Sequence, residues 1–235
     1  MDHVLELRDV SYYYKIRRPR RVGAGQARAD VLINANCAFR RGYIYALVGP
    51  SGTGKTTTLS LLGALEAPKS GQVLYKGMDV WEYGAAKYRR DHIGFVFQEY
   101  NLLNYLSAYQ NVIAAIEIAK NDVADRKEYA YGLLRDMQLD EALFHKNVGE
   151  LSGGEQQRAA IARALAANAD IILADEPTGN LDDETAIEII EAFKRVAHES
   201  DKCVIMATHS GLVKSHADYV VSVKGQGLHI DNLIY

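Results

Sequence analysis

The chain has 235 residues, of which 48% are hydrophobic and 24% are charged. This composition is typical of a folded globular protein and excludes a mainly disordered chain. The length allows one α/β domain, alone or with a smaller inserted lobe, and the net charge of -3 gives no overall electrostatic reason to expect nucleic acid as the main partner. We therefore expect one catalytic unit that does not bind nucleic acid.

Signals for export and membrane insertion are weak. The first residues contain no positively charged region followed by an apolar stretch, so we expect no signal peptide. No window has the ~18 consecutive apolar residues that a membrane span needs. Cys37 and Cys203 lack metal-binding or redox spacing and are expected to be buried thiols in a reducing compartment. Any work at a membrane would then pass through a partner protein.

The first 65 residues predict an antiparallel lobe and then a strand–turn–helix unit. Residues 4–14 and 31–39 are rich in aromatic and β-branched residues and predict two strands, joined by the basic connection 15–30. The apolar run 43–48 predicts a buried strand that glycine and proline end, and residues 55–65 have helical periodicity.

Strand and helix patterns alternate through the rest of the chain. The predicted strands are 71–75, 92–97, 171–174 and 203–207, the predicted helices are 107–120, 126–137, 154–168 and 185–199, and the predicted hairpin is 219–224 with 228–232. This alternation indicates a mainly parallel sheet covered on both faces. The two helices before residue 140 predict a helical insertion.

Residues 49–56 fit the pattern G-x4-G-K-[ST] between a predicted strand and a predicted helix. Glycines let backbone N–H groups turn toward a phosphate chain, and the helix adds its positive N-terminal end. Lys55 would place a charge on the β- and γ-phosphates, and the Thr56 hydroxyl would bind Mg²⁺. The flanking elements favour this phosphate loop over an ordinary glycine-rich turn. The predicted nucleotide-binding residues here are Gly49, Pro50, Ser51, Gly52, Thr53, Gly54, Lys55, Thr56 and Thr57.

Two acidic residues, Asp175 and Glu176, follow the predicted strand 171–174. The carboxyl edge of a parallel sheet is where such sheets bind ligands. We predict that Asp175 is a second anchor for Mg²⁺ and that Glu176 orients or deprotonates the attacking water. Taken alone, the pair could be solvated acids, but the phosphate loop favours the catalytic interpretation.

Residues 151–158 read LSGGEQQR. Ser152, with Glu155 three residues later, predicts a capping box at the start of a helix. A helix N-terminus with glycines and a hydroxyl is also a phosphate site, and one chain seldom needs two such sites for one nucleotide. If the second site covers the phosphates bound by a neighbouring molecule, a head-to-tail dimer follows.

This octapeptide resembles the signature motif of ABC ATPases, and the other motifs follow in that family's order over nearly the whole chain. The resemblance implies ATP hydrolysis with ATP and Mg²⁺, and a dimer that holds two ATP molecules between its copies. It implies that Tyr14 stacks on adenine, Gln98 contacts Mg²⁺ and senses the membrane partner, His209 lies at the γ-phosphate and Asp182 communicates across the dimer. The signature residues expected at the nucleotide are Ser152, Gly153, Gly154 and Gln156.

These assignments give three predicted sets. The catalytic set is Lys55, Gln98, Glu176 and His209, and the metal set is Thr56, Gln98 and Asp175. Strand alternation would put Tyr12 on the same face as Tyr14, so Tyr12 is the alternative stacking residue.

The resemblance implies an α/β fold with a P-loop NTPase core and a mainly parallel sheet, an N-terminal antiparallel β lobe and an inserted α-helical subdomain. Residues 1–235 would form a single ABC ATPase domain. Within it, residues 1–96 and 159–235 would form the core with its β lobe, and residues 97–158 the helical subdomain with the signature motif.

The sequences PTGNLD at 177–182 and QEYNLL at 98–103 resemble the lipoprotein-extraction, macrolide-export, bacitracin-resistance and cell-division subgroup. That implies a peripheral protein at the cytoplasmic face of the cell membrane, driving a mechanotransmission permease contacted near Gln98 to Leu103. A cell-division-type ATPase that regulates a cell-wall enzyme without moving substrate is the alternative. A chromosome-maintenance ATPase would need long heptad stretches, and a translation-factor cassette would carry two units; this sequence has neither.

The basic connection 15–30 departs from the family by its length. It holds Lys15, Arg17, Arg18, Arg20, Arg21 and Arg28. A solvated hairpin is one interpretation, and contact with anionic lipid headgroups or an acidic region of the partner is the other.

Overall fold

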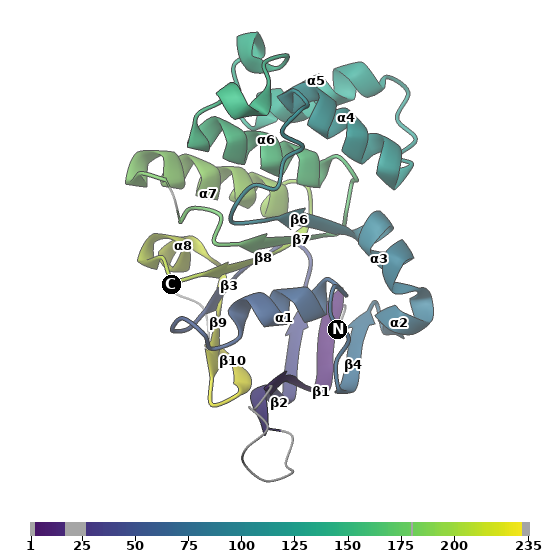
Figure 1. Cartoon of the computed structure of the whole chain (residues 1–235), viewed down its shortest axis with the longest axis vertical. Helices are drawn as coiled ribbons and strands as arrows, with labels where there is room; N and C mark the ends of the chain where they lie inside the picture. Colours follow the sequence, from purple (N-terminus) through teal and green to yellow (C-terminus); the bar gives the residue numbers. More distant parts are fainter. Residues whose placement is uncertain (1–2, 17–26, 180, 232–235) are drawn as a thin grey trace.

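The computed structural model describes residues 3–16, 27–179 and 181–231. Helix α1 (Lys55–Leu62) lies between two sheets, with β1 on one side and β7 and β8 of the larger sheet on the other (Figure 1). The helices α4 to α7 lie beyond the opposite face of the larger sheet. The predicted α/β fold with a P-loop core is thereby confirmed.

The smaller sheet is antiparallel, in the order β2-β1-β4-β5. Its strands are β1 (Leu5–Ile16), β2 (Ala27–Phe39), β4 (Ser70–Tyr75) and β5 (Met78–Asp79). Strands β1 and β2 extend into the basic connection, because Lys15 pairs with Arg28 across the hairpin. Arg28 also forms an ion pair of 3.0 Å with Asp30. The predicted contacts of Arg17, Arg18, Arg20 and Arg21 lie outside the described residues.

The larger sheet has the order β10-β9-β3-β8-β7-β6, and every neighbouring pair except β10–β9 is parallel. Its strands are β3 (Ile44–Val48), β6 (Ile93–Val96), β7 (Ile171–Asp175), β8 (Cys203–Thr208), β9 (Tyr219–Lys224) and β10 (Gly227–Asp231). Both faces are covered, so β8 is buried along its whole length. The carboxyl ends of five strands therefore meet at one edge.

The helices that cover the larger sheet carry an apolar face. Ile189, Ala192 and Phe193 of α7 (Asp183–His198) are buried on the side of the helix that faces the sheet. Three further helices were not predicted: α2 (Val80–Tyr83), α3 (Ala85–His92) and α8 (Gly211–His216). They are short, and α2 and α3 each bury only one side chain, so they have no apolar periodicity to detect.

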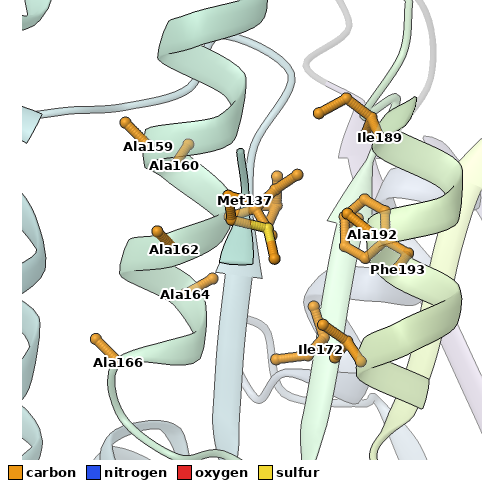
Figure 2. Packing of buried hydrophobic residues seen from close by; sticks show 14 of the residues in the cluster. Met137, Ala159, Ala160, Ala162, Ala164, Ala166, Ile172, Ile189, Ala192 and Phe193 are labelled. Atoms are coloured by element: carbon orange, nitrogen blue, oxygen red, sulfur yellow. The ribbon is translucent and has the colours of Figure 1, made fainter. Parts of the chain in front are cut away.

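Helix α6, part of the helical lobe, buries several alanine side chains. The helices of this lobe are α4 (Ala108–Ala119), α5 (Arg126–Asp136) and α6 (Gly153–Leu165), with short 3₁₀ turns at Glu141–Leu143 and Val148–Glu150. Figure 2 shows Ala160 and Ala164 of α6 on the side of the helix toward α7, with Met137 between these alanines and the bulky Phe193. The expected boundary between residues 158 and 159 falls inside α6, so this helix belongs to both parts.

One glycine brings α6 against the edge strand of the larger sheet. A Cβ added to Gly94 of β6 would lie 2.5 Å from the Ala164 carbonyl oxygen, which is too close for any other residue without a backbone shift. In the described part of the chain, no helix has the length and apolar content needed to cross a bilayer. Cys37 and Cys203 are buried free thiols, as predicted.

Candidate nucleotide site

The phosphate loop joins β3 to α1 and depends on glycine at its last position. Gly54 precedes α1 with φ of 104°, a conformation that other residues rarely adopt. A Cβ there would also lie 2.3 Å from Val31 Cγ1 of β2. The loop is therefore pressed against the antiparallel sheet, and the N-terminus of α1 opens toward the space beside it.

Lys55 is a buried cation that forms no direct ion pair among the described residues. Its side chain is 8% exposed, and Nζ donates to the carbonyl oxygens of Gly49 at 2.9 Å and Pro50 at 3.4 Å. None of the ion pairs among the described residues includes it. Burying a charge is costly unless it is paired, so this ammonium group fits a phosphate that completes its surroundings.

A cavity of about 730 Å³ opens beside the phosphate loop. Tyr14 lies on its wall, 48% exposed, with its hydroxyl 3.1 Å from Thr57 Oγ1. Tyr12 is only 3% exposed and donates to Glu66 at 3.0 Å. The two rings do lie close, with centroids 5.1 Å apart, but only Tyr14 offers a free face to a base. The geometry favours Tyr14 over the alternative Tyr12.

Two segments of the cavity wall were not predicted from the sequence. They are residues 29–31 of β2 and the turn 224–226 between β9 and β10. The turn is held on β2, because Ile33 N donates to the Gln226 carbonyl at 2.8 Å. The hairpin itself was predicted, but its position follows from the parallel pairing of β9 with β3, which no local pattern encodes.

Asp175 ends β7 beside the phosphate loop. Burial raises the pKa of its carboxyl group, while a hydrogen bond from the Thr56 side chain acts in the opposite direction. The structure thus brings together the two predicted metal ligands Thr56 and Asp175. Mg²⁺ prefers one or two protein oxygens together with substrate phosphates and waters, so this pair fits the ion. Mg²⁺ bound there would neutralise charge on the phosphate oxygens.

Glu176 and His209 form a hydrogen-bonded pair next to this site. Glu176 Oε1 lies 2.9 Å from His209 Nδ1, and His209 N donates to Oε2 at 3.3 Å. A carboxylate only accepts hydrogen bonds, so Nδ1 carries the proton. The Glu176 backbone has φ of 46°, an unusual value that a hydrogen bond of 2.9 Å from its N–H to the Ala207 carbonyl helps to hold.

The predicted capping box at Ser152 is present. The Ser152 N–H donates to Glu155 Oε2 at 2.7 Å, and the Glu155 N–H donates to Ser152 Oγ at 3.4 Å. The signature residues Ser152, Gly153, Gly154 and Gln156 do not line the nucleotide cavity of their own chain. The start of α6 therefore stays open to another molecule.

The remaining predicted residues lie apart from the cavity. Asp182 caps α7, accepting from Thr185 N at 3.0 Å, and a Cβ on Gly154 would lie 3.0 Å from Thr185 Cγ2. Asp182 is thus beside the signature residues rather than beside Lys55; its neighbour Asn180 lies outside the described residues. Gln98 is exposed on the turn after β6, does not line this cavity, and forms no hydrogen bond with Thr56 or Asp175 in the described part of the chain.

The comparisons with known proteins agree with this geometry. The family model described as ABC transporter matches residues 32–179. An uncharacterized ABC transporter ATP-binding protein of Bacillus subtilis, YclH, is 41% identical over 92% of this chain and 91% of its own. The lipoprotein-releasing system ATP-binding protein LolD of Geobacter metallireducens is 42% identical over 92% and 93%.

A macrolide export ATP-binding/permease protein, MacB of a Shewanella species, is 40% identical over 86% of this chain and 31% of its own length. Among solved structures, the dimeric bacterial ABC transporter cassette MJ0796 superposes with a TM-score of 0.87 at 33% identity, covering 98% of this chain and 99% of that one. The same cassette bound to ADP and Pi after hydrolysis gives a TM-score of 0.84. The similarity to LolD and MacB confirms the subgroup that the sequence resembled.

Proposed function

The chain belongs to the ABC transporter family as an ATP-binding subunit with ATPase activity, and we propose that two copies close around two ATP molecules to drive a membrane permease of the mechanotransmission type. One observation is the main support for the proposed dimer. The capped start of α6 is a phosphate-binding end that does not reach the cavity of its own chain. The dimeric state of the similar cassette MJ0796 supports this arrangement.

Within each site, the proposal gives the residues separate tasks. Lys55 and the backbone of the phosphate loop bind the phosphates, and Tyr14 stacks on the base, held by its bond to Thr57. Thr56 and Asp175 would hold Mg²⁺, joined on the family pattern by Gln98. Ser152 and Gly154 of the second copy cover the phosphates, with Gly153, Gln156 and Asp182 beside them.

Hydrolysis requires a base and a group that senses the terminal phosphate. Glu176 lies at the carboxyl edge of the sheet, where its carboxylate can accept a proton from water. Because His209 Nδ1 is hydrogen-bonded to Glu176, the other ring nitrogen, Nε2, is left to face the substrate. The pair would thus link the departure of the terminal phosphate to reopening of the dimer.

Replacement of Glu176 by Gln tests this assignment. The amide keeps the shape but cannot take a proton, so ATP should still bind, turnover should fall by roughly 10²-fold or more, and a dimer should accumulate in ATP. Size-exclusion chromatography with and without ATP measures the dimer. Normal turnover in Glu176→Gln would show that the base is another residue.

The permease contact is proposed at the groove beside residues 98–103. This groove, of about 410 Å³, is lined by Phe97, Ile118 and alanines of α4 and α6, with arginines at its rim. Ile118, which lines the groove, is 69% exposed, and Leu103 at the end of segment 98–103 is 39% exposed. Such exposed apolar side chains in one region fit a helix of a membrane protein at the cytoplasmic face.

Charged substitutions test the groove. Ile118→Glu should weaken co-purification of the membrane subunit by removing apolar contact, whereas Ile230→Glu, at an exposed isoleucine on β10, should not. Equal recovery of the membrane subunit with both variants would place the permease elsewhere. The relatives named for lipoprotein release and macrolide export favour extraction or export as the work performed.

A further inference from the structure

The segment after β6 is hydrogen-bonded to helix α6 through Arg163 and approaches the start of the helix at Gly153. The Arg163 guanidinium donates through Nη2 to the Tyr100 carbonyl at 3.0 Å and through Nη1 to the Asn101 carbonyl. At the other end of the helix, a Cβ on Gly153 would lie 3.1 Å from Tyr100 Oη. Ten residues separate Gly153 from Arg163, which is about 15 Å along a helix. Tyr100 therefore lies along this part of α6, with its carbonyl at Arg163 and its hydroxyl near Gly153.

The chemistry of Arg163 suits a clamp rather than an ion pair. Its side chain is half-buried, and burial lowers the pKa of the guanidinium. No ion pair among the described residues includes it, and its donors instead point at two successive backbone carbonyls. A planar guanidinium offers these two carbonyls donors in one fixed plane, whereas an ammonium group offers donors that rotate about a flexible stem.

The clamped carbonyls belong to residues with unusual backbone conformations. Tyr100 has φ of 61° and Asn101 has φ of 49°. Residues other than glycine rarely adopt this left-handed region, because their Cβ atom crowds the backbone there. Two such residues in succession need an external hold, and Arg163 contacts the carbonyl of each.

We propose that Arg163 is the positioning residue that locks segment 98–103 onto α6, so that this segment and the signature residues 152–154 move as one unit. The proposal rests on the function assigned above, in which a permease contacts the segment. A permease seated in the groove lined by Phe97, Asn101 and Arg163 would then displace the start of α6 without touching it. Closure over ATP in one subunit would be transmitted to the permease by the same route.

Arg163→Lys in the full chain is the test, because it keeps the charge and removes the fork. Amide hydrogen exchange should rise at residues 98–103 while α6 stays protected. The kcat for ATP should fall about fivefold to twentyfold, with KM within about twofold because ATP is bound by other residues. Arg195→Lys is the matched control: Arg195 Nη2 donates to the Asp136 carbonyl at 3.3 Å, and its loss should change neither exchange at 98–103 nor kcat.

A rescue variant separates a clamp from a general loss of stability. Glycine adopts the left-handed conformation freely, so Asn101→Gly added to Arg163→Lys should lower exchange at 98–103 and recover part of the lost kcat. Unchanged exchange and kcat in Arg163→Lys would overturn the proposal, as would a loss that Asn101→Gly does not reduce. If the unmodified chain failed to hydrolyse ATP, the proposed function would fail, while the exchange measurements would still decide the clamp.

Discussion

Two aspartates at opposite ends of β7 have opposite surroundings. Asp170, just before the strand, accepts from Arg41 Nη1 at 2.8 Å, from Lys76 Nζ at 2.9 Å and from the Tyr75 hydroxyl. Burial alone would raise its pKa, but these hydrogen bonds and charges outweigh burial and lower it. Asp175, at the other end, has its pKa raised by burial and is opposed by only one hydrogen bond, from Thr56, and the charge of Lys55.

The difference separates a structural carboxylate from a functional one. Asp170 joins the antiparallel lobe to the core, since Tyr75 ends β4 and Lys76 follows it, while Arg41 precedes β3. Its charge is satisfied inside the folded chain. The charge of Asp175 is not, and an unsatisfied charge beside a cavity is what a cation or a reaction can use. The functional residues therefore lie at the carboxyl edge of the larger sheet, where charged groups have few partners within the chain.

The largest expected effect is the loss of ATP turnover on substitution of Asp175. Asp175→Asn removes the carboxylate proposed for Mg²⁺, so ATP turnover should fall roughly 10²-fold to 10³-fold. Because the buried charge is unsatisfied, the free energy of unfolding at neutral pH should not decrease. Turnover and urea unfolding on the same preparation measure both. If Asp175→Asn were destabilised and still active, Asp175 would be a structural carboxylate and not a functional one.

A smaller effect, of the opposite kind, is expected at Asp170. Asp170→Asn leaves Arg41 and Lys76 without their carboxylate and should lower the free energy of unfolding by about 1 to 3 kcal/mol. Turnover per folded molecule should stay within about twofold, because Asp170 lies at the end of β7 away from the nucleotide. Loss of turnover at full stability would mean that this network takes part in catalysis.

The smallest effect is the pH dependence of these stability differences. The pKa of Asp170 is lowered on folding, so its stabilising contribution is present above the ordinary pKa of about 3.9 and is lost as the pH falls through the folded value. The loss of stability in Asp170→Asn should therefore shrink below about pH 4.

The pKa of Asp175 is raised on folding, so its contribution to stability is full below the ordinary pKa and is lost as the pH rises through the folded value. Any gain in stability from Asp175→Asn should then appear near neutral pH and vanish toward about pH 4. Urea unfolding between pH 3 and 7 would reveal both trends, and a deficit of Asp170→Asn that did not decrease between pH 4 and pH 3 would contradict this account.

The sequence predicted the parts of the site that depend on local pattern. Residues 49–56 lie between β3 and α1, and Asp175 ends a buried strand, as expected. Alternation could not choose between Tyr12 and Tyr14, because the choice depends on Glu66 and Thr57, which are far away in sequence.

Other features were beyond sequence reasoning because they depend on tertiary contacts. Asp170 is one acidic residue among 30 acidic side chains, and only the approach of Arg41, Tyr75 and Lys76 distinguishes it. The clamp of Arg163 on Tyr100 spans 63 residues and has no motif of its own. The short helix α2 starts at a local cap, where Asp79 accepts from Trp81 N at 2.7 Å, and not at a periodic apolar pattern.

The wall of the nucleotide cavity also has a consequence for the order of assembly during synthesis. Tyr14 is synthesised before the turn 224–226, although both lie on the same wall of the cavity. Domains generally gain structure from the N-terminal end as they are made. The cavity that would hold ATP is therefore complete only after the turn 224–226 has been synthesised and has paired with β2.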